Sequence, residues 1–497
     1  MNVPYSAAQP LPLPAPANTL PRLVIVGLSG GVGKTIVSLG LVGAFRRLGL
    51  AVQPFKKGPD YIDAAWLGLA AGVTSMNLDP FLMPPNFLAP LLADRMANTV
   101  PADTAQLVLI EGNRGLFDGK DLTGSCSSAE VARLLNAPVL LVVDATKMTR
   151  TVAAIVQGCR YFEPNLRLAG VVLNRTAGKR HQALLAECLS AYTDVPVLGM
   201  LPKLTPNPIP ERHMGLISIR EQSSANIVAT LDRLADIATA HLDLSGIWQA
   251  AAAAGPLPPI IEGLRLWPDP VIEILDAKVS RPRIGCVRDA ALWFYYEENL
   301  EALRRAGAEL VDVSLLTSTA WPALDGLYLG GGFPEIHVET LANNTFIRRH
   351  LASLAAAGLP IYAECGGFMV LAETIVAGER RYPMAGVFPV ATELCSRPQG
   401  LGYVKARVVA DIPFFPTGMQ LCGHEFHYSR CLTSNTAGLT FSLTLNRGTG
   451  MLGQRDGLIH RNTFAAYTHL HALGVPEWAP RFVAAALAWH RSSKFST

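Results

Sequence analysis

The sequence predicts an α/β protein of two domains, each built on a β-sheet and helices. Two observations predict this fold class. Short apolar strands alternate with helical stretches in both halves of the chain, and in the first half this pattern indicates a doubly wound, mostly parallel sheet. A stretch rich in alanine and proline separates the halves, and we expect a linker at residues 243–281. With 497 residues, the chain is long enough to bury two large cores.

The composition narrows the class of protein. Only 16% of the residues are charged and the net charge is +3, so we expect no nucleic-acid partner and no anionic membrane surface. The eight cysteines are scattered without metal-type spacing, which is typical of reduced thiols in the cytoplasm. No apolar run reaches the roughly 18 residues of a membrane span. Residues 1–20, rich in proline and alanine, predict a disordered tail before a first domain at 21–242.

A glycine-rich loop, LSGGVGKT, joins the first predicted strand to a helix. Backbone N–H groups in such a loop cradle phosphates, while Lys34 would reach the outer phosphates and the Thr35 hydroxyl suits Mg²⁺. Five residues, and not the standard four, separate Gly27 from Gly33, but the strand–loop–helix context still indicates a phosphate site rather than a structural turn. The candidate nucleotide contacts here are Gly30, Gly31, Val32, Gly33, Lys34 and Thr35.

Polar residues follow further predicted strands of the first domain. Asp60 and Tyr61 come after the second strand, although a Gly-Pro-Asp turn alone is often structural. Glu111 ends a buried strand, where a carboxylate is the usual second Mg²⁺ contact of such ATPases. Asn174 ends another strand. Since the carboxyl ends of parallel strands meet at one edge, we expect these residues to line one crevice, with Asn174 near the nucleotide and Asp60 and Tyr61 near the substrate.

In the second half, the segment LPIYAECGGFMVL at 359–371 predicts a strand, a sharp turn and a helix. Cys365 lies in that turn, where a helix N-terminus would lower the pKa of the thiol and favour a thiolate nucleophile. Gly366 would let a substrate approach backbone N–H groups that form an oxyanion hole. The alternative is a buried structural cysteine followed by a glycine-rich turn.

A nucleophilic cysteine needs a histidine base, and the segment AYTHLH supplies two candidates. On one strand Tyr467, His469 and His471 would share a face, so the residues alone permit either histidine. Gly331 and Gly332, after another strand, would supply the second oxyanion donor unless they form a plain turn. The cluster HEFHY at 424–428 has metal-ligand composition, but neighbouring strand residues point to opposite faces, so we expect no metal there.

Ten motifs together resemble the cobyrinic acid a,c-diamide synthase family, the ATP-dependent, glutamine-hydrolysing amidases of corrinoid synthesis. They are GGVGKT (30–35), KKGPDYIDAAW (56–66), NLDP (77–80), EGNRGLFDG (111–119), PERHMGL (210–216), RDAALWFYYEENLE (288–301), LYLGGGFPE (327–335), YAECGGFMVL (362–371), HEFHYS (424–429) and YTHLH (467–471). By this resemblance the first domain is similar to P-loop ATPases of the dethiobiotin synthetase group. Residues 282–497 are similar to class I glutamine amidotransferases of the cobalamin type.

The resemblance implies a mechanism with ATP, Mg²⁺ at Thr35 and Glu111, and an acyl phosphate of the substrate. Ammonia would come from glutamine through a thioester on Cys365. The resemblance favours His469 as the base and implies that the third triad carboxylate is absent. His471 then stands close to the place where related glutaminases carry that carboxylate.

The acceptors implied are the a- and c-acetate groups of cobyrinate or hydrogenobyrinate. A sirohydrochlorin-type ring is the alternative, because Trp293 and the segment after the histidines depart from a typical cobyrinate enzyme. A regulatory P-loop ATPase with a decayed glutaminase domain is a further alternative, against which Cys365 and His469 argue. Glutamine and a tetrapyrrole are the expected partners, and a homodimer is the oligomeric state to test.

Overall fold

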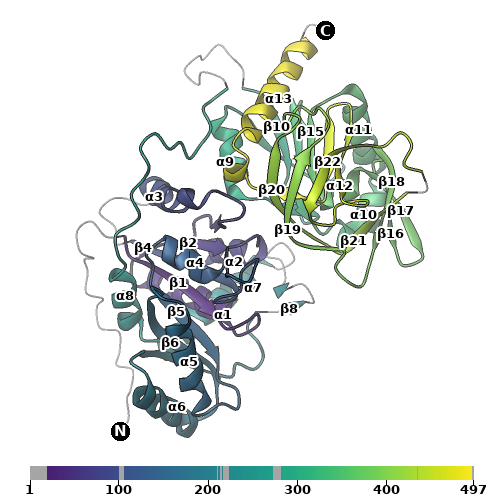
Figure 1. Cartoon of the computed structure of the whole chain (residues 1–497). Coiled ribbons are helices and arrows are strands. Elements are labelled where there is room, and N and C mark those ends of the chain that lie inside the picture. The colour runs from purple at the N-terminus through teal and green to yellow at the C-terminus, as the bar shows by residue number, and fades with distance from the viewer. Residues whose placement is uncertain are drawn as a thin grey trace. The chain divides into compact units, whose positions relative to one another are not determined.

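The computed structural model describes residues 20–99, 106–209, 211–212, 215–216, 223–271, 281–433 and 435–494 (Figure 1). It divides into two compact units, Met1–Pro80 with Pro85–Leu264, and Phe81–Pro84 with Arg265–Thr497. The predicted tail up to residue 19, three residues of the motif PERHMGL and residues 272–280 of the predicted linker lie outside the described residues. Within the described ranges, no helix has both the length and the apolar character needed to cross a membrane.

A seven-stranded parallel sheet forms the centre of the first unit, in the order β3-β2-β4-β1-β5-β6-β7. The central strands are apolar and buried almost throughout, as expected for a parallel sheet covered on both faces. The predicted doubly wound α/β fold is therefore confirmed. The strands are β1 (Arg22–Gly27), β2 (Ala51–Lys57), β3 (Met76–Leu78), β4 (Gln106–Gly115), β5 (Val139–Asp144), β6 (Leu168–Thr176) and β7 (Val197–Pro202), with a short pair β8 (Glu211–Arg212) and β9 (Gly215–Leu216).

Helices connect these strands, and α1 packs against α7 and the core of the sheet. The first helix begins at Lys34, directly after Gly33, which has a left-handed φ of 97°. The helical segments are α1 (Lys34–Arg47), α2 (Ile62–Ala71), η1 (Pro85–Phe87), α3 (Leu88–Thr99), α4 (Ser128–Leu134), α5 (Thr151–Phe162), α6 (Lys179–Tyr192), α7 (Ser224–His241) and α8 (Leu244–Ala252).

The predicted linker begins too early in the chain. Residues Leu244–Ala252 form α8, and the Asp243 carboxylate caps that helix by accepting a hydrogen bond from Gly246 N at 2.9 Å. Trp248 is buried in the hydrophobic core of the first unit. Alanine is the strongest helix former, so the alanine-rich stretch is a packed helix at its start and not a spacer.

The second unit has a ten-stranded mixed sheet, in the order β12-β10-β13-β15-β24-β23-β22-β19-β20-β25. The first five strands in this order are parallel, and the rest pair antiparallel. The strands of this sheet are β10 (Arg283–Val287), β12 (Glu309–Val313), β13 (Gly326–Leu329), β15 (Ile361–Glu364), β19 (Gly400–Val408), β20 (Gln420–His427), β22 (Thr440–Arg447), β23 (Arg455–His460), β24 (Thr463–Ala466) and β25 (His469–Leu470).

Smaller sheets and helices complete the second unit. The strands β11 (Leu292–Phe294) and β14 (Gly331–Gly332) form one pair, and β16 (Ala372–Ala377), β17 (Arg380–Pro383), β18 (Phe388–Leu394) and β21 (Ser429–Leu432) form a four-stranded sheet. The helical segments are α9 (Glu297–Arg305), η3 (Pro334–His337), α10 (Val338–Asn343), α11 (Thr345–Ala357), α12 (Gly366–Leu371), η4 (Ala472–Gly474) and α13 (Trp478–Lys494).

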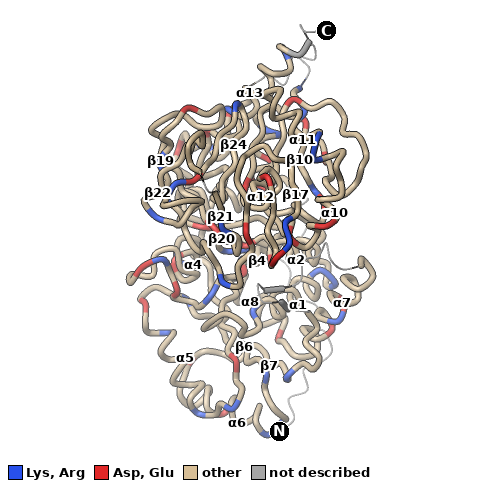
Figure 2. The backbone as a smooth tube through the Cα atoms, turned by 90° about the vertical axis from the view of Figure 1, so that its right-hand side faces the viewer, with Lys and Arg blue, Asp and Glu red and all other residues tan. Residues whose placement is uncertain are grey.

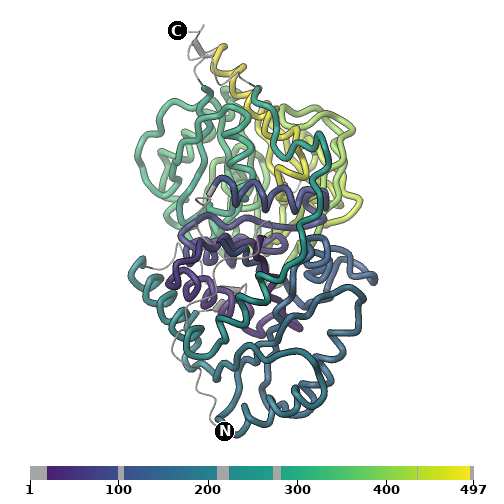
Figure 3. The backbone as a smooth tube through the Cα atoms, turned by 90° about the vertical axis from the view of Figure 1, so that its left-hand side faces the viewer, coloured from purple at the N-terminus to yellow at the C-terminus, as the bar shows by residue number. Residues whose placement is uncertain are grey.

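Distant segments of the chain meet inside this second unit. The helices α9 and α13 contact each other, and the chain can be followed by colour from teal at α9 to yellow at α13 (Figure 3). Acidic and basic residues are both scattered along the backbone of each unit (Figure 2). The α/β fold predicted for this half is confirmed, with an antiparallel extension that carries His469 on β25.

Candidate functional site

The phosphate loop of the first unit is fixed by residues from another strand. Asn174, on β6, donates a hydrogen bond from Nδ2 to the Val32 carbonyl oxygen at 2.8 Å. A Cβ atom at Gly33 would lie 2.1 Å from that same Nδ2, so only glycine allows this approach at the positive φ. Arg175 donates to the Gly31 carbonyl oxygen at 2.9 Å and pairs with Asp144. Asn174 therefore lies at the loop as predicted and positions its backbone.

A cavity of about 740 Å³ opens beside this loop, within the size range of small-molecule sites. Its lining includes most of the residues that we predicted to contact nucleotide or substrate: Gly30, Gly31, Gly33, Lys34, Thr35, Asp60 and Asn174. Val32 is buried, Tyr61 precedes α2, and Glu111 lies beneath the lining residues Thr35 and Lys56. Sequence reasoning missed several residues of this lining, notably Arg114, Lys203 and Asn207.

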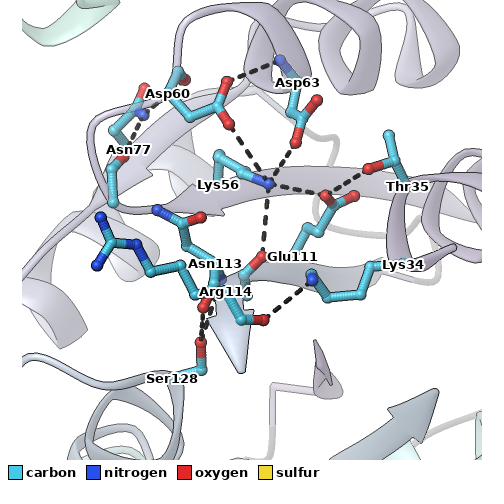
Figure 4. A network of polar contacts seen from close by, with 12 residues as sticks. Lys34, Thr35, Lys56, Asp60, Asp63, Asn77, Glu111, Asn113, Arg114 and Ser128 are labelled. Carbon is cyan, nitrogen blue, oxygen red and sulfur yellow. Dashed lines mark hydrogen bonds and ion pairs between the residues drawn. The ribbon is translucent and has the colours of Figure 1, made fainter. Parts of the chain in front are cut away.

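Lys56 is buried at the centre of three carboxylates, of which Glu111 is buried and Asp60 and Asp63 are half-buried (Figure 4). Its Nζ atom is 2.6 Å from Asp63 Oδ2, 2.7 Å from Glu111 Oε1 and 3.8 Å from Asp60 Oδ2. The same Glu111 oxygen accepts a hydrogen bond from Thr35 Oγ1 at 3.0 Å. The two residues predicted to bind Mg²⁺ are therefore in direct contact, and Lys56 balances the negative charge around them.

The cluster shifts the proton affinity of its members. Burial works to lower the pKa of Lys56, but Asp63, Glu111 and Asp60 outweigh it and raise that pKa, so Lys56 stays charged. Burial, and then the charge of Asp63, raises the pKa of Asp60 to about 7. Lys56 is thus one buried cation among three carboxylates. When an anion or a metal ion binds there, the balance of charges and protons within this cluster can change.

Lys34 is held by the phosphate loop and by the end of β4. Its Nζ atom donates to the carbonyl oxygens of Ser29 at 2.8 Å and Arg114 at 3.0 Å. Burial lowers the pKa of Lys34, which indicates that its ammonium is poorly solvated. A buried ammonium at the N-terminus of α1 is suited to bind the phosphates of a nucleotide.

In the second unit, Cys365 occupies a strained turn between β15 and α12. Its φ of 47° and ψ of −100° lie outside the favoured regions for a residue with a side chain. Its backbone N–H donates to the Ala466 carbonyl oxygen at 2.7 Å, which ties the turn to the end of β24. A nucleophile on a strained strand-to-helix turn is a recurrent device for exposing a reactive side chain.

The predicted lowering of the thiol pKa is wrong. Burial raises the pKa of Cys365 well above its ordinary value, and the nearby charge of Glu335 adds to this. The backbone N–H of Gly366 works in the opposite direction but is outweighed, because α12 has only six residues and Cys365 is 6% exposed. The thiol is therefore neutral at rest, and its proton must be removed by a base.

Gly331 and Gly332 lie between the cysteine turn and His469. A Cβ atom at Gly331 would lie 2.5 Å from His469 Cε1, and one at Gly366 would lie 3.0 Å from Gly332 N. The structure thus brings together the glycine pair, the turn and one of the two candidate histidines. The backbone nitrogen of Gly332 therefore lies close to Gly366, in the turn that carries the candidate nucleophile.

The strand argument for the two histidines does not hold. Strand β24 ends at Ala466, and the backbone N–H groups of Tyr467 and Thr468 both donate to the buried Asp456 carboxylate at 3.0 Å. The chain is therefore not one continuous strand, so alternation does not place His469 and His471 on a common face.

A carboxylate lies beside His469, although the family resemblance implied that the third triad carboxylate is absent. His469 Nδ1 lies 3.4 Å from Glu364 Oε2, whereas His471 Nε2 lies 3.6 Å from Glu298 Oε1. His471 accepts a hydrogen bond from Leu473 N and stabilises the η4 turn. Sequence reasoning missed Glu364, although it directly precedes the candidate nucleophile Cys365.

The cluster HEFHY divides between two environments. The His424 ring stacks on His469 with ring centres 4.8 Å apart, and its Nδ1 contacts the Tyr296 hydroxyl at 3.2 Å. The Glu425 carboxylate accepts hydrogen bonds from Thr449 N and Gly450 N. No group of three or more potential metal-ligating side chains converges on a metal-binding geometry within the described residues.

Comparisons with known proteins agree with both halves of this description. Residues 23–216 match the family described as CobQ/CobB/MinD/ParA nucleotide binding domain, and residues 283–476 match the CobB/CobQ-like glutamine amidotransferase domain. A cobyrinate a,c-diamide synthase of Magnetococcus marinus is 41% identical over 96% of this chain and 99% of its own length. Enzymes of the same name from Archaeoglobus fulgidus and Salmonella typhimurium are 37% and 36% identical, over 94% and 93% of this chain and 98% and 97% of theirs. The chain therefore belongs to the cobyrinate a,c-diamide synthase family.

Proposed function

We propose that this protein amidates the a- and c-acetate carboxylates of cobyrinate or hydrogenobyrinate, using ATP and ammonia from glutamine. The observation that carries the proposal is Cys365 on its strained turn, in a chain whose first unit has a nucleotide-type phosphate loop. Similarity over nearly the whole length to enzymes named cobyrinate a,c-diamide synthase supports the choice of ring.

The first half of the reaction activates a carboxylate. A carboxylate oxygen attacks the γ-phosphorus of ATP, ADP leaves, and the product is an acyl phosphate. Ammonia then attacks the acyl carbon, and phosphate leaves with the oxygen that came from the carboxylate. Lys34 would stabilise the charge on the transferred phosphoryl group, as a fixed cation does best where water is excluded.

The residues beside the loop fit a magnesium ion. Thr35 Oγ1 and Glu111 Oε1 lie 3.0 Å apart, and a hydroxyl and a carboxylate are hard oxygen ligands of the kind that Mg²⁺ prefers. When bound, the ion would neutralise charge on the nucleotide phosphates. Lys56 would hold the Glu111 carboxylate in place and could turn from it toward an incoming carboxylate or phosphate.

The second half of the reaction releases ammonia from glutamine. The Cys365 proton moves to His469, and the thiolate attacks the carboxamide carbon of glutamine. The tetrahedral oxyanion is stabilised by backbone N–H groups near Gly332 and Gly366, and ammonia leaves with the proton from His469. Water, deprotonated by His469, then hydrolyses the thioester to glutamate and restores the thiol.

One assay tests the proposed function. The protein is incubated with ATP, glutamine and each candidate ring, and the added amides are counted by mass. We expect the diamide of cobyrinate or hydrogenobyrinate, with ADP release that depends on glutamine. Amidation of a sirohydrochlorin-type ring alone would favour that alternative, and ADP release without any amide would favour a regulatory ATPase.

The two histidines are expected to differ in function. His469→Ala should lower the rate of glutamine hydrolysis by about 10²-fold or more, the scale of general-base catalysis. Compared with His469→Ala, His471→Ala should lower glutaminase activity less and the stability of the fold more. The reason is that it leaves the buried Glu298 carboxylate without its imidazole neighbour. Glutaminase rates and thermal unfolding of both variants test this, with ammonium salts as a second nitrogen source. A larger loss of glutaminase activity in His471→Ala would reverse the assignment of the base.

A further inference from the structure

Glu364 is the last residue of β15 and lies immediately before the candidate nucleophile. Its Oε2 atom is 3.4 Å from His469 Nδ1, and the two side chains are 1% and 3% exposed. Both groups are thus shielded from water. An imidazole beside a buried carboxylate is the arrangement by which hydrolases fix a histidine base, although here the carboxylate comes from the nucleophile turn.

Three donors hold the Glu364 carboxylate in this position. Oε1 accepts from the Leu470 backbone N–H at 3.1 Å and from the Tyr362 hydroxyl at 3.1 Å. Oε2 accepts from the Tyr328 hydroxyl at 3.3 Å, and that hydroxyl itself accepts from Asn299 Nδ2 at 3.2 Å. The donor from Leu470 also belongs to the strand that carries His469, so the carboxylate and the imidazole are tied to each other through β25.

Other groups near His469 are less suited to this task. His424 stacks flat against the ring, and burial keeps the pKa of His424 well below its usual value, so it brings no charge. His471 is turned toward Glu298 and the η4 turn, and its ring packs on Tyr296 at 4.8 Å between centres. Of these neighbours, only Glu364 offers a negative charge to the Nδ1 side of His469.

We propose that Glu364 is the positioning carboxylate of the glutaminase site and holds His469 with a proton on Nδ1. This tautomer leaves the acceptor at Nε2, the atom that would take the Cys365 proton, and the carboxylate stabilises the imidazolium that then forms. The inference rests on the glutaminase half of the proposed function. It makes the segment Glu364-Cys365 a combined motif that supplies both the nucleophile and the group that orients its base.

The substitution Glu364→Gln tests this role. The glutamine side chain has the same shape and can still accept hydrogen bonds at one atom, but its amide N–H would face Nδ1 and favour the other tautomer. We expect the turnover of glutamine to fall by about 10²-fold or more, with little change in the KM for glutamine. Ammonia-driven amidation should be retained. In ¹⁵N spectra of histidine-labelled protein, the His469 resonances should change from the Nδ1–H to the Nε2–H tautomer.

Glu298→Gln is the matched control, because it alters the other buried carboxylate that faces a histidine ring. It should leave glutamine turnover close to that of the unmodified protein. If Glu364→Gln does not fold, Tyr328→Phe takes its place, since it removes a donor to Oε2 while keeping the aromatic ring. That variant should lower turnover without changing the KM, and unchanged turnover in it would overturn the proposal.

The outcomes separate this inference from the proposed function. Glutamine hydrolysis that persists in Cys365→Ser would overturn the glutaminase assignment, and the role of Glu364 with it. Hydrolysis that is lost in Cys365→Ser but remains near normal in Glu364→Gln would overturn only the role of Glu364. A Glu364→Gln variant with raised KM, normal turnover and an unchanged His469 tautomer would assign a purely structural role to this carboxylate.

Discussion

Replacing Cys365 by serine is expected to abolish glutamine-driven amidation while leaving ammonia-driven amidation close to that of the unmodified protein. The hydroxyl is a much weaker nucleophile than a thiol, and no thioester can form without sulfur. The phosphate loop and its cavity lie entirely within the first unit, so activation of the carboxylate does not require the thiol. The measurement is amide formation with glutamine and, separately, with a high concentration of an ammonium salt.

Cys431→Ser is the matched control for this experiment. Cys431 belongs to the same unit and core cluster, is 5% exposed, and burial raises the pKa of its thiol to about 12. It therefore reproduces the loss of a buried thiol without touching the strained turn, and it should retain glutamine-driven amidation. Sustained glutamine-driven synthesis in Cys365→Ser, or equal losses in the two variants, would contradict the assignment of the nucleophile.

The raised pKa of Cys365 adds a pH dependence to the same prediction. Since the neutral thiol is the resting form, alkylation of Cys365 in the absence of glutamine should be slow near neutral pH. Its rate should keep rising as the pH passes the ordinary thiol pKa of 9.0. A plateau of the alkylation rate below pH 8 would show a resting thiolate instead.

Local patterns in the sequence were sufficient to predict the fold class and the turn that holds Cys365. The glycine-rich loop with Lys34 is a short-range signal, since strand, loop and helix follow one another in the chain. The same is true of Cys365, which the structure places between β15 and α12 as predicted. The linker boundary failed because an alanine-rich segment is equally compatible with a spacer and with the packed helix α8.

The predictions that failed concern properties that depend on packing between distant segments of the chain. The short distance from Glu364 to His469 joins β15 to β25, two strands that are not neighbours in the order of the sheet, and no local pattern reveals it. Burial of Cys365 outweighed the helix terminus because the surrounding core excludes water, and a sequence shows the terminus but not the core. Lys56 was within reach of sequence reasoning, since it is the last residue but one of β2, and it pairs in register with Glu111 on β4. A lysine near the end of one buried strand, paired with a carboxylate on the neighbouring strand, is therefore a sequence pattern that can indicate such a charge cluster.

Lys34→Ala should remove amidation with either nitrogen source, because no acyl phosphate forms without charge stabilisation at the transferred phosphoryl group. We expect a loss on the order of 10²-fold or more, as found when one fixed donor of a preorganised site is removed.

Glu111→Ala should act in the same direction, since it removes the carboxylate that contacts both Thr35 and Lys56. Lys179→Ala, at the exposed start of α6 and not among the residues that line the cavity, is the control for loss of a lysine. The assay is ammonia-driven amide formation with ADP release. Near-normal ammonia-driven activity in Lys34→Ala would refute its role at the phosphates, and the same result in Glu111→Ala would refute the proposed magnesium ligand.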